Sequence, residues 1–287
     1  MGLEAYFNKD RLNVKSLAVE NPDKSSATSF NPEKEISVSG WHSIIKEIEA
    51  ARIQGKWNNF IFLSADLKVL SPDRFSQLIF DERCYKGFEE QLLSARAHDN
   101  IIYYCKLLAA LKIIDPHWTE TAYLGPEYWQ SISDTLKINF EIPNWNDFWG
   151  QAAIAKIVFQ DKLPEQYEKF EKEYLSKALQ RTEEFLENQR ESGFIDVNLG
   201  IPACMKIAVP QGFDIEGMDY IDLPQVRREI DKQRQGNNWT YILELVKKMK
   251  ILSAGKIKLA KEGLELLPPK NKGLKQEDVP LPEPRKF

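Results

Sequence analysis

Residues 145–158, WNDFWGQAAIAKIV, contain a pattern that recurs through most of the chain. Lys156 is followed by two aliphatic residues, and the same lysine-aliphatic-aliphatic triplet begins at Lys68, Lys112, Lys206 and Lys250. The intervals between successive lysines are 44, 44, 50 and 44 residues. A period of this size is typical of stacked supersecondary units that cannot each bury an apolar face alone. The pattern therefore predicts a protein built from five repeated units.

Two apolar stripes precede each lysine, and both have helical spacing. The first begins 27 residues earlier and continues three and seven residues further on, which is one face of a helix. The second begins eleven residues before the lysine. Its first positions are Trp57, Ile101, Trp145, Ile195 and Trp239. Each unit is therefore predicted to be a pair of α-helices, and the fold class to be all-α.

The fourth unit departs from the pattern in two ways. Its interval is six residues longer, and the helical spacing that starts at Pro164 predicts a longer first helix. Pro202 falls inside the predicted second helix, where a proline is expected to kink or shorten it.

The repeated lysine has two interpretations. A row of five ammonium groups could bind phosphates or an acidic partner. However, the apolar positions of the second stripe centre within about 20° of the lysine on the helix surface. We therefore expect each stem to pack on the apolar face and each ammonium to reach carbonyl groups at a helix C-terminus, where the helix dipole favours a cation. Six of the seven tryptophans occupy columns where other units carry Ile, Leu, Tyr or Cys, which predicts core packing rather than stacking on a ligand.

The chain divides into three predicted regions. Residues 1–35 are interpreted as an N-terminal cap and a polar linker, and residues 36–267 as the five-repeat helical array. Within the array, alternating apolar residues at 255–267 predict a small C-terminal β-hairpin. Residues 268–287 carry five prolines and several lysines and are predicted to be a disordered tail.

Composition limits the functional classes. Charged residues make up 29% of the 287 residues, but the net charge is only −4, which disfavours a general nucleic-acid or membrane-surface binder. Three cysteines without a CxxC spacing favour a reducing compartment, and no apolar run is long enough for a membrane span, so we expect a cytoplasmic protein. The sequence has no P-loop, HExxH, GxGxxG or GxSxG motif. We therefore expect no enzymatic activity, no cofactor and no metal site.

One segment is a candidate for contact with a partner. Tyr167, Phe170 and Tyr174 extend an apolar stripe beyond the point where neighbouring units are expected to cover it. An uncovered stripe of this kind would suit a protein partner. The alternative is that residues 1–35 fold back over it.

The period and the two-helix unit resemble those of HEAT and armadillo repeats over roughly residues 37–267. The resemblance implies a right-handed solenoid of five two-helix repeats that acts as a non-catalytic protein-interaction scaffold or adaptor. It does not extend to any motif that identifies a site. A nucleic-acid-binding helical repeat protein is the alternative, and it would require a one-sided basic stripe.

Overall fold

The computed structural model describes residues 32–116, 124–189, 195–209, 223–254, 256–260 and 263–267. The chain separates into two compact units, Met1–Phe30 and Asn31–Phe287, and all described residues belong to the second. The predicted cap and linker therefore lie outside the described residues except for 32–35, as does the predicted tail. In these ranges, the chain is mainly α-helical, which confirms the all-α class.

Five helix pairs follow one another along the chain, each with a second helix of 14 or 15 residues. The pairs are α1 (Val38–Ile53) with α2 (Trp57–Leu70), α4 (Glu82–Ala97) with α5 (Ile101–Ile114), α7 (Pro126–Glu141) with α8 (Trp145–Phe159), α10 (Ser176–Gln189) with α11 (Ile195–Ala208), and α12 (Leu223–Gln235) with α13 (Trp239–Ser253). The short 3-10 helix η4 (Pro32–Glu35) precedes α1, and α3 (Pro72–Phe75) follows α2. Each second helix begins at the first residue of the second apolar stripe.

The longer first helix of the fourth pair is present. It consists of α9 (Pro164–Phe170), a π-helical turn η5 (Glu171–Leu175) and α10 without a break between them. Pro202 lies inside α11, which nevertheless has 14 residues like α2 and α5. Of the two expected effects, a kink or a shorter helix, the proline therefore does not produce the shorter helix.

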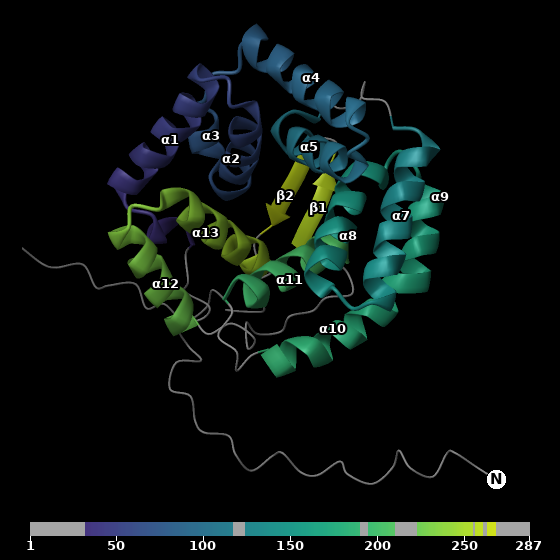
Figure 1. The fold of residues 1–287 in the computed structure, drawn as a ribbon. Helices are drawn as coiled ribbons and strands as arrows, with labels where there is room; N and C mark the ends of the chain where they lie inside the picture. Colours follow the sequence, from purple (N-terminus) through teal and green to yellow (C-terminus); the bar gives the residue numbers. More distant parts are fainter. Residues whose placement is uncertain are drawn as a thin grey trace, which may run out of the picture. The chain divides into compact units, whose positions relative to one another are not determined.

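The second helices form a closed circuit, with the first helices outside them (Figure 1). α2 packs against α5, α5 against α8, α8 against α11, α11 against α13, and α13 returns to α2. An open solenoid would place the first and last units at opposite ends, whereas here they are neighbours. The described residues therefore form a closed ring of helix pairs rather than an open array.

Specific contacts close the ring between the last pair and the first. The Nζ of Lys247 on α13 lies 2.6 Å from a carboxylate oxygen of Asp66 on α2. A Cβ atom at Gly40 would lie 2.4 Å from the ring of Trp239, so only glycine lets α1 approach α13 this closely. The Nζ of Lys250 donates a hydrogen bond to the backbone oxygen of Leu70, at the end of α2.

The repeated lysines make the same contact around the ring. Each of four lysines donates from Nζ to a carbonyl near the C-terminus of the next second helix. The bonds are Lys68 to Ile114 (2.9 Å), Lys112 to Ile157 (2.8 Å), Lys206 to Leu252 (2.6 Å) and Lys250 to Leu70. These carbonyls have no partner within their own helix, and the negative end of the helix dipole attracts a cation there. The prediction that these lysines reach helix-end carbonyls is confirmed at these four positions.

Lys156 is the exception, and the lengthened helix explains it. Its Nζ lies 4.8 Å from the centre of the Tyr167 ring and 3.7 Å from Glu171, and its side chain is almost fully buried. The hydroxyl of Tyr167 donates to the backbone oxygen of Ala208, at the end of α11. Tyr167 therefore satisfies the carbonyl that a lysine satisfies in the other pairs.

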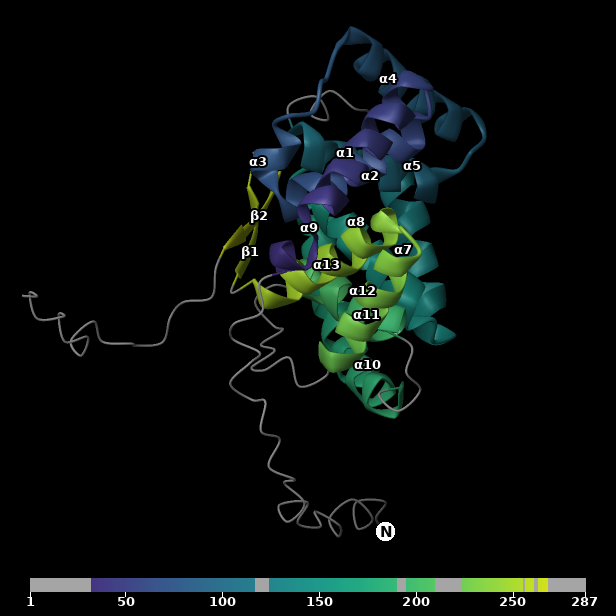
Figure 2. The same cartoon turned by 90° about the vertical axis from the view of Figure 1, so that its left-hand side faces the viewer.

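The predicted hairpin consists of β1 (Lys256–Ala260) and β2 (Gly263–Leu267), which pair antiparallel with Ile257 opposite Leu266. β2 packs against α2 and α5. Figure 1 shows the hairpin within the circle of helices, and Figure 2 shows it at one edge of them. The hairpin therefore covers one mouth of the ring, on the side where α13 ends.

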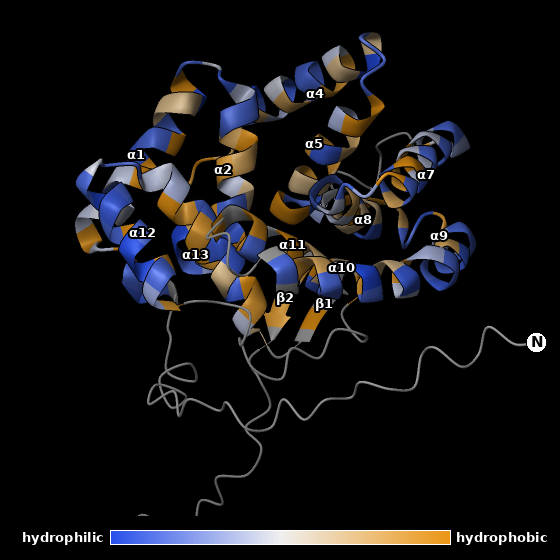
Figure 3. Cartoon of the chain, turned by 60° about the horizontal axis from the view of Figure 1, so that its bottom comes forward, coloured by the Kyte–Doolittle hydropathy of each residue, from blue (hydrophilic) through white to orange (hydrophobic). Residues whose placement is uncertain are grey.

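The core lies between the outer and inner helices. The six tryptophans predicted to be core are all buried: Trp41, Trp57, Trp129, Trp145, Trp149 and Trp239. Trp149 is fully buried and donates from Nε1 to the hydroxyl of Thr182 on α10 (2.8 Å). In Figure 3 the visible sides of α1 and α12 are mainly hydrophilic, whereas α2 and α11 are mostly hydrophobic.

Candidate functional site

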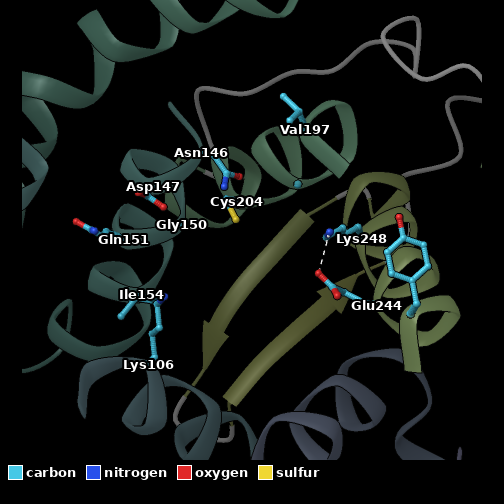
Figure 4. A pocket seen from close by; sticks show the side chains of 12 residues that line it. Lys106, Asn146, Asp147, Gly150, Gln151, Ile154, Val197, Cys204, Glu244 and Lys248 are labelled. Atoms are coloured by element: carbon cyan, nitrogen blue, oxygen red, sulfur yellow. Dashed lines mark ion pairs between the residues drawn. The ribbon is translucent and has the colours of Figure 1, made fainter. Parts of the chain in front are cut away.

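A cavity of about 430 Å³ lies inside the ring. Four of the five inner helices line it: α5, α8, α11 and α13 (Figure 4). Its lining comes mostly from three columns of the repeat. Six residues before the repeated lysine are Lys106, Gly150, Gly200 and Glu244; nine before it are Asp147, Val197 and Tyr241; and two before it are Ile154, Cys204 and Lys248. These spacings of three and four residues describe one helical face, so each helix turns the same face toward the cavity.

Two glycines create much of the open space. A Cβ atom at Gly150 would meet no atom within 4 Å, and one at Gly200 would meet only the end of Lys248 and Asn146 at 3.9–4.0 Å. Neither glycine is therefore needed for close packing, in contrast to Gly40. Glycine inside a helix costs about 0.5–1 kcal/mol relative to alanine. The two glycines keep the wall between α8 and α11 free of side chains at that cost.

The charges around the cavity are balanced in sign but not all paired. Glu244 and Lys248 form an ion pair one turn apart on α13, at 2.9 Å. Lys106 is exposed and has no ion-pair partner among the described residues. Asp147 accepts a hydrogen bond from the side-chain amide of Asn144 (2.8 Å) and likewise forms no ion pair within the described ranges. The cavity thus offers one unpaired cation and one unpaired anion.

Gln151 is the most informative polar residue of the lining. It is 8% exposed, and its buried amide oxygen has no hydrogen-bond partner in the described part of the chain. A buried amide without a partner costs about 1–3 kcal/mol. The equivalent repeat positions in α5 and α13 are occupied by Leu107 and Leu245, which are buried apolar residues. The glutamine is therefore a polar replacement in a core column, and its unpartnered amide oxygen is buried rather than exposed to the open space.

The cavity lacks an activated nucleophile among the side chains that line it. Burial raises the pKa of the Cys204 thiol, and a thiol that stays protonated is a poor nucleophile. In the described ranges, no three His, Cys, Asp or Glu side chains lie close enough to share a metal ion. The arrangement is suited to binding a polar molecule through charges and hydrogen bonds.

The three residues predicted to contact a partner do not form an uncovered stripe. Tyr167 and Phe170 are 2% and 4% exposed, and both pack against Trp129 at ring-centre distances of 6.2 and 6.0 Å. Tyr174 is partly exposed and stacks on Phe170 at 5.4 Å. The stripe is therefore not uncovered, because rings of α7 and α8 pack on it. The alternative that residues 1–35 fold over it lies outside the described residues except for 32–35.

The cavity residues were not singled out from the sequence, although a signal was present. The position six residues before the repeated lysine is chemically mixed. It is occupied in turn by Phe62, Lys106, Gly150, Gly200 and Glu244. A column on one helical face that carries glycine and both charges is unlike the apolar core columns. This contrast in residue type distinguishes a helical face that lines a cavity from a face that packs against other helices.

The comparisons with known proteins add no relative: no family model, no curated protein and no solved structure matches the chain. Among the helices that the structure describes, none has both the length and the apolar character needed to cross a membrane.

Proposed function

We propose that the five helix pairs are copies of one repeat unit closed into a ring, and that the protein is a non-catalytic scaffold that binds a protein partner. The partner surface is the rim of the ring where outer helices turn into inner helices. This rim lies opposite the mouth that the hairpin covers. The supporting observation is the distribution of exposed apolar side chains.

Three consecutive outer helices carry exposed aliphatic residues toward this rim. Ile53 ends α1 and is 63% exposed, Leu93 lies in the second half of α4 at 64%, and Ile142 follows the last residue of α7 at 74%. Ile138, one turn before Ile142, is 56% exposed. In repeat register all four fall between 19 and 14 residues before the lysine. Single exposed aliphatic residues are ordinary, but their recurrence at one level of successive units favours a contact surface.

The opposite rim provides a matched control. Val38, at the start of α1, is 72% exposed, and Ile79, shortly before α4, is 56% exposed. Replacing exposed aliphatic residues by serine removes little buried surface at either rim, so both sets of variants are expected to fold.

The experiment is affinity capture with the full chain from cells that express it naturally, followed by a direct binding measurement with the purified partner. The variant Ile53→Ser/Leu93→Ser/Ile142→Ser is expected to weaken that binding at least tenfold, and Val38→Ser/Ile79→Ser to leave it unchanged. Equal binding by the two variants contradicts the assignment of the rim. Capture that depends on nucleic acid and disappears after nuclease treatment supports the nucleic-acid-binding alternative instead.

A further inference from the structure

We propose that α9 and the π-helical turn η5 form a strap that leaves the ring reversibly, and that Lys156 then replaces Tyr167 at the end of α11. This conformational device goes beyond the scaffold function and does not depend on the rim. The inference rests on one backbone carbonyl, that of Ala208, for which the chain holds two candidate donors.

Ala208 occupies the acceptor position that belongs to a repeated lysine. In three other units the lysine donates to the residue two positions after the lysine of the next unit around the ring. These acceptors are Ile114, Leu252 and Leu70. Ala208 is two positions after Lys206, so its carbonyl is the acceptor that this pattern assigns to Lys156. In the structure, the hydroxyl of Tyr167 donates to that carbonyl instead, at 3.3 Å.

Lys156 lies against the strap without a hydrogen bond to any described residue. Its Nζ is 4.8 Å from the centre of the Tyr167 ring and 3.7 Å from Oε1 of Glu171, which is longer than a hydrogen bond. An ammonium group has three N–H donors, and burying it without a hydrogen bond is unfavourable. The other four repeated lysines each donate to a helix-end carbonyl. Departure of Tyr167 gives Lys156 the same kind of acceptor.

The exchange of donors keeps the end of α11 satisfied. Carbonyls in the last turn of a helix have no partner within that helix, so the loss of Tyr167 alone would leave the Ala208 oxygen without its donor. Because Lys156 supplies the replacement, α8 and α11 gain the bond that joins the other neighbouring inner helices. The strap therefore leaves while the ring stays closed.

The construction of the strap suits this movement. α9 has only seven residues, and a helix of that length has little stability of its own in water. It joins α10 through the π-helical turn Glu171–Leu175, a rare geometry that often marks functional sites. The rings of Tyr167 and Phe170 lie 6.2 and 6.0 Å from that of Trp129, and Phe170 lies 6.5 Å from Phe148. Departure of the strap uncovers this aromatic surface of α7 and α8.

The first test is amide hydrogen exchange of the full chain, followed by mass spectrometry at several urea concentrations below the unfolding transition. Amides of α9 are expected to exchange at least tenfold faster than those of α8, relative to their unfolded rates. Their exchange should also depend less on urea, because departure of the strap exposes less surface than global unfolding does. Exchange of α9 with the same protection and urea dependence as α8 would overturn the proposal.

The variant Lys156→Met tests the exchange of donors. It removes the donor that the open state needs, while its thioether still makes a favourable contact with the Tyr167 ring in the closed state. Exchange of the α9 amides should therefore become at least threefold slower. If Lys156 served only to hold the strap in place, its loss would make exchange faster.

The matched control is Lys172→Met, on the strap itself. Its side chain is 74% exposed and pairs with Glu168, also on the strap, so this variant should change the exchange of α9 less than twofold. Unchanged or faster exchange in Lys156→Met would overturn the proposal. A Lys156→Met chain that does not fold would overturn it as well, since the proposal requires this substitution to favour the closed state.

Discussion

Removal of the ammonium group of Lys250 tests whether the ring is closed. Lys250 belongs to the last inner helix, yet its Nζ donates to the backbone oxygen of Leu70 in the first inner helix and to Glu33 at 2.7 Å. The substitution Lys250→Met keeps a long apolar side chain and removes only the cation. In an open array this lysine would have no unit beyond it, and its loss would matter little.

The expected loss of stability follows from the contacts. A hydrogen bond from a charged group contributes about 1.5–3 kcal/mol. In the variant, the carbonyl oxygen of Leu70 would lose this donor. The Glu33 carboxylate is 42% exposed, so its ion pair adds at most about 1 kcal/mol. We therefore expect Lys250→Met to lower the free energy of unfolding by about 2–3 kcal/mol. The control Lys232→Met, whose side chain is 74% exposed, should cost less than about 0.5 kcal/mol.

The assay is urea unfolding followed by tryptophan fluorescence, with the slope of free energy against urea checked for constancy. A double-mutant cycle with Glu33→Gln separates the carboxylate contribution from that of the Leu70 carbonyl. Lys206→Met is the positive control, because that buried lysine makes the equivalent bond to Leu252 at 2.6 Å. A loss for Lys250→Met that is no larger than that for Lys232→Met would refute the closure of the ring in solution.

Four further outcomes are expected, each measured by urea unfolding. Gly87→Ala should destabilise the protein by about 1–3 kcal/mol, because its Cβ would lie 2.2 Å from the Trp57 ring; no loss would show that α4 does not approach Trp57 this closely. Gly150→Ala should instead stabilise it by about 0.5–1 kcal/mol, since the Cβ enters open space within a helix; a loss would mean that the cavity is filled in the free protein. Tyr167→Phe should cost about 0.5–1.5 kcal/mol by removing the donor to a helix-end carbonyl; an unchanged midpoint would contradict this. Burial raises the pKa of Cys105 from 9.0 to about 12. The contribution of this thiol to stability is complete below pH 9 and should be lost as the pH rises from about 9 to 12. The variant Cys105→Ala should therefore lose less free energy of unfolding over this pH range, and an identical pH dependence in the variant would contradict the shift.

Local structure was the most predictable part of the molecule. The first residues of the inner helices could be assigned from the second apolar stripe because Trp or Ile begins it in every unit. In α5 and α8, Asn100 and Asn144 precede that residue and accept backbone N–H bonds from Tyr103 and Asp147. An apolar face and a capping residue act over a few residues, so the sequence contains both signals completely.

Contacts between distant units were less predictable. The lysine pattern indicated that each ammonium reaches a helix end, but it did not indicate which helix. The partner lies 45–46 residues ahead for Lys68, Lys112 and Lys206, and 180 residues back for Lys250. The role of Tyr167 was missed for a related reason: its hydroxyl replaces a lysine only because α9 is inserted between Lys156 and the end of α11. Such a substitution is visible only once the helices are placed in space.

Closure of the ring also explains why the candidate site depends on glycine. Helices that pack about 8–10 Å apart in a five-sided ring have axes about 7–8.5 Å from its centre. A helix with its side chains has a radius of about 5–6 Å, so only about 1–3.5 Å would remain free around the axis. If side chains of ordinary size pointed toward the axis, they would fill a ring of this size. Side chains at the neighbouring buried positions fill the space between the helices in this way. Gly150 and Gly200 occupy the same repeat position on α8 and α11, and neither is needed for contact with a neighbouring helix. Their effect is to open the lumen beside Lys106 and Asp147.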